Sequence, residues 1–350
     1  MPIPPLLHDL LTAVAPSGRE GPAAAIWREA AAEFAEVSSD TLGTSFARVP
    51  AAEGAPRLAI VGHIDEIGMT ITHVGDDGLL AVSVLGGYDP EQMLGQRVLL
   101  AGREGIVRGV VGRRLLSREE RADRGPVKHA DLHVDIGATS REDAERLVRA
   151  GDVGVWQGEP VELANNRITS RALDNRLGAY AALEAARRVA ESGDAQVEVV
   201  AVAAVQEELG YHGARTAVFA LDPQVALAID VTWTTDVPGG NPKRVGRIVL
   251  GGGAAVTLGP VVSTVVSDLI REAAEAEGIA YAVEVYSDRT QTDADVLHIS
   301  RGGVPTGILS IPVRYMHSAV EVCSLDDLES VIALAAAFAR RLDRETDFLR

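Results

Sequence analysis

A formal net charge of −17 over 350 residues makes this chain a poor partner for nucleic acids or anionic membranes. No apolar run is long enough to span a bilayer, and the single cysteine, Cys323, excludes an intramolecular disulfide. Because the N-terminal segment lacks a basic region followed by an apolar one, we expect no signal peptide and predict a cytoplasmic protein.

Two amphipathic helices are predicted at the start of the chain, over residues 3–14 and 21–37. The segment Ala15-Pro16-Ser17-Gly18 between them carries residues that end a helix. An apolar run at residues 58–61 then predicts the first buried strand. This strand leads directly into Gly62-His63-Ile64-Asp65-Glu66, which carries one histidine and two carboxylates.

The composition changes after residue 68, where glycine becomes frequent and the segments become short and alternating. Such segments are typical of the strands of a small β-barrel or sandwich. They occur at residues 79–85, 97–100 and 106–111. Helix-and-strand alternation resumes near residue 165. We therefore predict a catalytic domain made of residues 1–68 plus 165–350, with an inserted β-barrel domain at residues 69–164.

The second half of the chain alternates apolar strands with amphipathic helices. The predicted strands are residues 197–205, 225–229 and 306–311. The predicted helices are residues 174–190, 210–221, 261–278 and 325–342. This alternation, with strands rich in β-branched residues, predicts an α/β fold with a mostly parallel sheet flanked by helices.

Side chains that bind metals follow four of the predicted strands. They are His63, the pair Glu207 and Glu208, Asp230 and His317. Because ligands bind beyond the carboxyl ends of the strands in open α/β sheets, we expect these side chains at one edge. Two adjacent carboxylates at the end of a buried strand are costly unless a positive charge compensates them. A metal ion is the usual compensation.

Asp174, at the start of the helix predicted over residues 174–190, has two interpretations. An aspartate in this position could simply cap the helix N-terminus. It could also be a carboxylate that belongs to the metal cluster. We favour the second interpretation because the cluster needs a shared carboxylate.

Two histidines with three or four carboxylates form a ligand set suited to zinc, cobalt or manganese. The chain has neither an H-E-x-x-H nor a C-x-x-C sequence, so the familiar one-metal zinc signatures are absent. A carboxylate-rich set fits two metals that share one bridging carboxylate. Asp65, two residues after His63, could accept the second N–H of the imidazole. Since adjacent side chains do not readily bind one metal, we expect one of Glu207 and Glu208 to be a ligand and the other a base.

Five ordered motifs give the sequence a resemblance to a known family. They are H-I-D-E-I-G at residues 63–68, A-L-D-N-R at 172–176, V-Q-E-E-L-G at 205–210, the strand end at Asp230, and R-Y-M-H-S at 314–318. Together they resemble the dinuclear metallo-aminopeptidases known as tetrahedral (TET) peptidases, which include glutamyl and deblocking aminopeptidases. The resemblance covers nearly the whole chain. It implies a phosphorylase/hydrolase-like catalytic domain and an insert that serves oligomerisation, with a tetrahedral homododecamer as the assembly.

The same resemblance implies a role for each candidate residue. The residues that would hold one divalent ion, zinc or cobalt, are His63, Asp174 and Asp230, and those that would hold the other are Asp174, Glu208 and His317. Glu207 matches the general base of the family, and Asp65 matches the residue that orients His63. The segment Thr290-Gln291-Thr292-Asp293-Ala294 differs from the family's G-G-T-D-A in its first two residues, at the border of the substrate pocket.

These expectations combine into one predicted function. We expect an aminopeptidase that removes N-terminal residues from short peptides with a free N-terminus, using metal-activated hydroxide and Glu207 as general base. The alternatives are a deacylase or carboxypeptidase of the same fold, a glycosidase, and a non-catalytic assembly protein. A glycosidase needs two carboxylates about 5–9 Å apart across a sugar, and the adjacent Glu207 and Glu208 are poorly placed for that.

Overall fold

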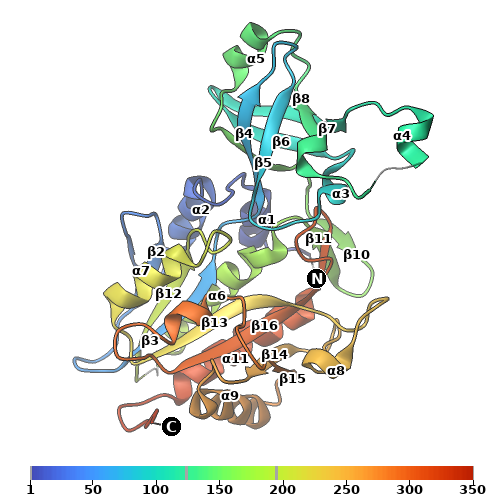
Figure 1. Cartoon of the computed structure of the whole chain (residues 1–350). Helices are drawn as coiled ribbons and strands as arrows, with labels where there is room; N and C mark the ends of the chain where they lie inside the picture. Colours follow the sequence, from blue (N-terminus) through green and yellow to red (C-terminus); the bar gives the residue numbers. More distant parts are fainter. Residues whose placement is uncertain (1, 123–124, 194–195, 350) are drawn as a thin grey trace.

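The computed structural model describes residues 2–122, 125–193 and 196–349, and consists of a large sheet covered by helices with a small barrel beside it (Figure 1). Within these residues the large sheet has 11 strands. From one edge to the other its main path runs through β1 (Glu36–Ser39), β2 (Ser45–Val49), β12 (Glu198–Ala204), β3 (Arg57–His63), β13 (Val225–Trp233), β16 (Thr306–Arg314), β17 (Glu321–Ser324), β11 (Arg167–Ser170) and β10 (Val161–Leu163). Two further strands, β14 (Ala254–Leu258) and β15 (Tyr281–Val285), branch from β16. The predicted α/β fold with an inserted barrel is confirmed, but the sheet is mixed and not mostly parallel, because antiparallel strands extend it on both sides of its parallel centre.

The four central strands β12, β3, β13 and β16 run parallel, and the strands outside them on this path pair antiparallel. Ala204 pairs with His63, and Ala228 pairs with Val61, which puts Asp230 level with His63. Parallel strands end at the same edge of a sheet. This register therefore delivers the residues at the ends of these strands to one place.

Helices cover both faces of the sheet, and the side-chain alternation along β3 shows why. Leu58 and Ile60 pack on one face, whereas Ala59 and Val61 pack on the other. Because both faces are buried, the strand carries no polar side chain between its ends. The helices on the first face are α1 (Pro5–Thr12), α2 (Gly21–Ala31), α6 (Leu173–Ser192), α9 (Thr264–Glu277) and α11 (Leu325–Arg341). Those on the second are α7 (His212–Leu221) and α10 (Ala294–Leu297).

Helix α6 lies against β3 at two glycines. A β-carbon on Gly62 would lie 2.3 Å from the carbonyl carbon of Gly178, so a larger residue at position 62 would push the helix away. Glycine lets the two backbones touch. This contact brings the start of α6, which carries Asp174, beside the end of β3, which carries His63.

The barrel is a closed ring of six strands that stands at the top of Figure 1. In ring order they are β4 (Gly68–Val74), β5 (Leu80–Leu85), β8 (Leu132–Asp135), β7 (Gly105–Arg113), β6 (Arg97–Gly102) and β9 (Val153–Trp156). The barrel has its own apolar core, in which Leu80, Val98, Leu100 and Val134 are fully buried. Strand β10, which lies inside the predicted insert, pairs with β11 in the large sheet instead.

Short helices complete the described chain. They are α3 (Pro90–Met93), α4 (Arg118–Ala122), α5 (Arg141–Leu147), α8 (Pro242–Val245) and a 3-10 turn at His129–Asp131. No helix of the described ranges is both long and apolar enough to cross a membrane.

The second helix is shorter than the sequence predicts. It was expected over residues 21–37, but α2 ends at Ala31 and residues 36–39 form strand β1. Val37 pairs with Ala47 and Ser38 with Phe46 in this edge hairpin. Pairing with β2 therefore decides the conformation of these residues, and helical periodicity does not.

Candidate metal centre

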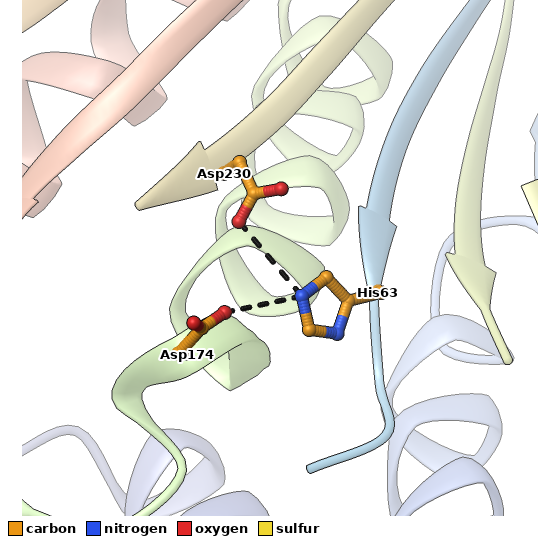
Figure 2. A group of neighbouring side chains, drawn as sticks. All are labelled: His63, Asp174 and Asp230. Atoms are coloured by element: carbon orange, nitrogen blue, oxygen red, sulfur yellow. Dashed lines mark hydrogen bonds and ion pairs between the residues drawn. The ribbon is translucent and has the colours of Figure 1, made fainter. Parts of the chain in front are cut away.

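His63 is the point at which a first group of candidate ligands meets (Figure 2). It is the last residue of β3, and its Nε2 atom lies 3.1 Å from Oδ1 of Asp174 and 3.8 Å from Oδ1 of Asp230. Asp174 belongs to the start of α6 and Asp230 to β13. All three side chains are buried, and one ligand atom of each lies within 4.8 Å of the others. This is a spacing that one metal ion can occupy.

His317 gathers a second group on the other side of Asp174. Its Nε2 atom lies 3.2 Å from Oδ2 of Asp174 and 3.6 Å from Oε1 of Glu208. Ligand atoms of these three residues also lie within 4.8 Å of one another, as do those of His63, Glu207 and Glu208. Asp174 therefore turns one oxygen toward each histidine, which is the arrangement by which a carboxylate bridges two metals.

Asn175, and not Asp174, caps the start of α6. An N-cap side chain accepts a backbone N–H two or three residues further on, and here Asn175 accepts that of Gly178, whereas the carboxylate of Asp174 contacts His63 and His317. Asn175 orders this segment: its amide group donates to the carbonyl of Ile229 and accepts from the N–H of Gly178, both at 2.8 Å. The carboxylate of Asp174 is thereby left to face the histidines.

Asp230 lies inside β13 and not at its end, which corrects the predicted strand boundary. The strand was expected to stop at residue 229, where the first charge appears, but it continues to Trp233. Residues 231–233 pair with residues 311–313 of β16, and this ladder extends the strand. Asp230 still reaches the cluster because it is level with His63 in the sheet.

Asp65 connects the His63 loop to the Glu207–Glu208 pair. It is fully buried, and its Oδ1 lies 3.3 Å from Nδ1 of His63. Its two oxygens also accept the backbone N–H groups of Glu207 at 3.1 Å and of Glu208 at 3.2 Å. The hydroxyl of Ser17 donates to it at 2.6 Å. Sequence reasoning predicted only the contact with His63.

A buried ion-pair cluster lies beside this loop. Glu66 accepts hydrogen bonds from Arg171 and Arg176, and all three side chains are buried. Arg176 also donates to the carbonyls of Leu10 and Ala15. Two guanidinium groups beside one carboxylate leave a positive charge near the carboxylate-rich centre, and they tie the end of α1 to it.

Burial and mutual repulsion shift the pKa values of the clustered carboxyl groups. Burial, reinforced by the charge of Asp174, raises the pKa of Glu208 to about 8. Burial also raises the pKa values of Glu207 and Asp230 well above the usual range. Burial acts in the same direction on Asp174, but hydrogen bonds with the two histidines outweigh it and lower the pKa of that residue.

The two histidines have raised pKa values. Burial on its own disfavours an imidazolium, but the hydrogen bond with Asp174 outweighs it and raises the pKa of His317 to about 10. At His63 burial is likewise outweighed, by the charge of Glu207 and the hydrogen bond with Asp174, so its pKa lies well above the usual value. The surrounding carboxylates therefore attract positive charge strongly.

The residues present fit divalent metal ions. Four carboxylates and two imidazoles meet in a cluster that is buried except for the partly buried Glu208 and His317, and these are the ligands that zinc and related ions take in proteins. The protein's own side chains leave the negative charge of this cluster under-compensated, as the raised carboxyl pKa values show. The structure thus brings together all five residues predicted as ligands, with Glu207 and Asp65 beside them.

Two further buried carboxylates lie at this centre: Glu321 is absent from the sequence-based prediction, and Asp293 appears there only as part of the segment at residues 290–294. Glu321 accepts the backbone N–H groups of Asp174 and His317. Asp293 is 3% exposed, and its Oδ1 has no hydrogen-bond partner among the residues that the structure describes. Burial raises the pKa of Asp293 to about 7. A signal for Glu321 was available in its position four residues after His317, at a point where the surrounding residues are apolar.

One loop of the barrel reaches the metal centre. Gly86, just after β5, has φ +75°, and a β-carbon on it would lie 2.5 Å from Cγ2 of Ile67 and 3.0 Å from Oε2 of Glu208. Gly87 follows, and a β-carbon there would lie 4.0 Å from Nδ1 of His317. The barrel therefore supplies part of the wall of the site.

Known proteins are similar to this chain in sequence and in architecture. A family model described as M42 glutamyl aminopeptidase matches residues 43–334. The lysyl aminopeptidase of Pyrococcus furiosus is 37% identical over 312 residues, which cover 88% of this chain and 87% of that protein. The TET aminopeptidase of Thaumarchaeota archaeon SCGC AB-539-E09 superimposes with a TM-score of 0.92 at 33% identity, over 97% of this chain and 96% of that one. The TET1 peptidase of Pyrococcus horikoshii, which can assemble into a tetrahedron or a large octahedral shell, gives 0.85 at 28% identity over 96% and 99%.

Fold, site and relatives together define the class of protein as a metal-dependent aminopeptidase, an enzyme that hydrolyses peptide bonds. The chain belongs to the M42 family of glutamyl aminopeptidases. The resemblance to the TET peptidases that the five motifs indicated is confirmed.

Proposed function

We propose that this enzyme removes N-terminal residues from short peptides with two divalent metal ions, zinc or cobalt, and with Glu207 as general base. His63, Asp174 and Asp230 would hold one ion, and Asp174, Glu208 and His317 the other. The observation that carries the proposal is the position of Asp174, which lies 3.1 Å from one histidine and 3.2 Å from the other. Its two oxygens support one ion on each side.

The assignment of Glu207 as base follows from how the pair is arranged. Glu208 lies beside His317 and Asp174, in the second group. Glu207 lies 3.8 Å from Nε2 of His63, on the other side of the pair. Adjacent side chains do not readily bind one ion, so Glu207 is the carboxylate that remains for proton transfer.

The metals, when bound, would acidify a water molecule and polarise the scissile carbonyl. Glu207 takes the proton from the attacking water and passes it to the leaving amine. Its side chain is 9% exposed, so bulk water does not compete strongly for this proton. Asp65 fixes the backbone of Glu207 through the hydrogen bond at 3.1 Å and thereby positions the base.

A free N-terminus is the feature of the substrate that this centre favours. Asp174, Asp230 and Glu208 supply three negative charges to the metal pair, and Glu207 adds a further carboxylate beside them. A protonated α-amine is attracted to such a group. Acetylation of that amine removes its charge, so the peptide should bind and react more weakly.

The experiment compares one peptide in free and in N-acetylated form. Acetylation should lower hydrolysis at least about tenfold, which matches the loss of one charge-assisted hydrogen bond worth roughly 1.5–3 kcal/mol. A chelator should abolish activity, and zinc or cobalt should restore it. Equal cleavage of both forms would identify a deacylase or an endopeptidase. Sugar release from a soluble β-glucan that is lost with Glu207→Gln would support the glycosidase alternative.

We also propose that the predicted insert at residues 69–164 mediates self-association into a tetrahedral homododecamer, beside a catalytic domain of residues 1–68 plus 165–350. Large apolar side chains exposed on the barrel support this: Ile106 is 47% exposed and Val110 is 48% exposed. The assembly described for TET1 peptidase supports the geometry. Native mass spectrometry of the full chain tests it, and a monomer at micromolar concentration would contradict it. The cytoplasmic location stays a prediction from the sequence.

A further inference from the structure

Glu321 ties together two distant segments of the chain, and both carry candidate ligands. It is the first residue of β17 and is 1% exposed. Its Oε2 accepts the backbone N–H of Asp174 at 3.0 Å, and its Oε1 accepts the backbone N–H of His317 at 2.8 Å. One side chain therefore fixes the backbone of the shared carboxylate and that of the second histidine at the same time.

The backbone of His317 needs such an anchor. Its φ is +61°, in the left-handed region that residues other than glycine rarely adopt. Strained residues of this kind persist only where the surroundings hold them. The hydrogen bond to Glu321 fixes the peptide group of His317 directly, and the direction of its imidazole depends on that peptide group.

A second carboxylate, that of Asp65, likewise fixes the backbone of two other residues of the metal centre. Asp65 accepts the backbone N–H groups of Glu207 and Glu208, as Glu321 accepts those of Asp174 and His317. Asp65 also contacts the imidazole of His63, whereas Glu321 contacts its two residues only through their backbone. Asp65 therefore positions His63 and the glutamate pair, and Glu321 positions Asp174 and His317.

We infer that Glu321 is a positioning residue that controls occupancy of the second metal site, formed by Asp174, Glu208 and His317. The inference rests on the proposed dinuclear function. When Glu321 is removed, His317 is released from its left-handed conformation and Asp174 loses one of its backbone anchors. The first site keeps His63 and Asp230, which Glu321 does not touch. The second ion should therefore be lost before the first.

The experiment is a metal titration of Glu321→Ala and Glu321→Gln, followed by isothermal calorimetry and native mass spectrometry without peptide. Loss of a group that orients metal ligands typically weakens binding about 10–100-fold. In Glu321→Ala the second zinc or cobalt ion should bind about 10–100-fold more weakly, while the first should lose less affinity, because it shares Asp174 with the second but also keeps His63 and Asp230. Glu321→Gln keeps one carbonyl acceptor for one of the two N–H groups and should show a smaller loss. The glutamine variant also provides a measurement if the alanine variant does not fold.

Asp327 provides a matched control. It is a fully buried carboxylate that accepts two backbone N–H groups, those of Gly253 at 2.7 Å and Gly251 at 2.8 Å. Asp327→Asn therefore disturbs a similar two-amide contact, in a segment that carries no candidate ligand. It should lower the melting temperature of the metal-free protein but leave both ions bound as in the wild type.

Two results would overturn the inference: wild-type affinity for both ions in Glu321→Ala, or an equal loss of the second ion in Asp327→Asn. The first would show that Glu321 does not position the ligands, and the second that general destabilisation explains the effect. Failure of the proposed function looks different. A wild-type protein that binds two ions but cleaves no peptide contradicts the aminopeptidase mechanism and leaves the role of Glu321 intact. A wild-type protein that binds only one ion contradicts both.

Discussion

Asp174 and His317 are joined by a 3.2 Å contact between Oδ2 and Nε2, while the other oxygen of Asp174 faces His63. Replacing the shared ligand should therefore change the binding of both metal ions, whereas replacing a ligand of one group should change the binding of one ion. Asp174→Asn should lower the affinity for both ions, whereas Asp230→Asn should affect only the ion held with His63. Metal content measured after dialysis at a fixed free-metal concentration distinguishes the two. Equal stoichiometry in both variants would contradict a bridging role.

Substitutions of the two adjacent glutamates should have different effects, one on activity and the other on metal binding. Glu207→Gln should keep both metals and lose activity by roughly 10²–10⁴-fold, the usual effect of a positioned general base. Glu208→Gln should instead weaken binding of the ion near His317. Steady-state kinetics together with metal analysis on the same preparations test the assignment. A fully active Glu207→Gln enzyme with unchanged metal content would show that another group is the base.

The stability of the metal-free protein should fall as the pH rises. The pKa of Glu208 is raised from 4.5 to about 8 and that of His317 from 6.5 to about 10, so the folded protein holds protons that the unfolded chain releases. A state that binds more protons is stabilised at low pH, and this stabilisation is lost as the pH rises from about 5 toward 10.

Metal binding should reverse this trend, because ions displace the same protons and bind more tightly as the pH rises. We expect the increase in melting temperature caused by saturating cobalt to be larger at pH 8.5 than at pH 6.5. Thermal scans with cobalt and with a chelator at both pH values measure it. The same increase at both pH values would mean that proton release does not accompany binding.

The barrel loop at Gly86 should be sensitive to a single methyl group. Gly86→Ala places a β-carbon 2.5 Å from Ile67 and 3.0 Å from Glu208, and it also meets the left-handed strain of φ +75°. Gly95 is a matched control, because its φ is +80° and nothing lies within 4 Å of a β-carbon there. Gly95→Ala should lose only about 1–2 kcal/mol of stability from the backbone strain. Gly86→Ala should lose more stability and also affinity for the ion at Glu208, as calorimetry and denaturant titration would show.

The sequence predicts the residues at the carboxyl ends of the parallel strands well, because the signals for them are local. His63 and the Glu207–Glu208 pair each follow a short apolar run, and parallel strands bring such positions together whatever the rest of the chain does. Asp230 is a position at which the local sequence predicts the wrong strand boundary. A charge after an apolar run predicts the end of a strand, but pairing with β16 continues past Asp230.

Contacts between distant segments are what the sequence did not reveal. Glu321 touches Asp174 across 147 positions of the chain, and Asp65 touches the amides of Glu207 and Glu208 across 142 and 143. A single glutamate or aspartate has no periodicity that would indicate a backbone partner so far away. Such residues become visible only when the fold has brought the two segments together, which is why Asn175 and Glu321 were missed.

The candidate ligands are scattered along the chain from residue 63 to residue 317, and none of the metal groups can be assembled from one local segment. The metal centre therefore forms only when these distant segments have packed together in the native fold. An incomplete or partly unfolded chain lacks at least one wall of each site, and any peptidase activity it could have is withheld until the sheet, helix α6 and the barrel loop are all in place. For an enzyme that cuts peptides, this dependence links the appearance of activity to the appearance of the native state and keeps folding intermediates inactive.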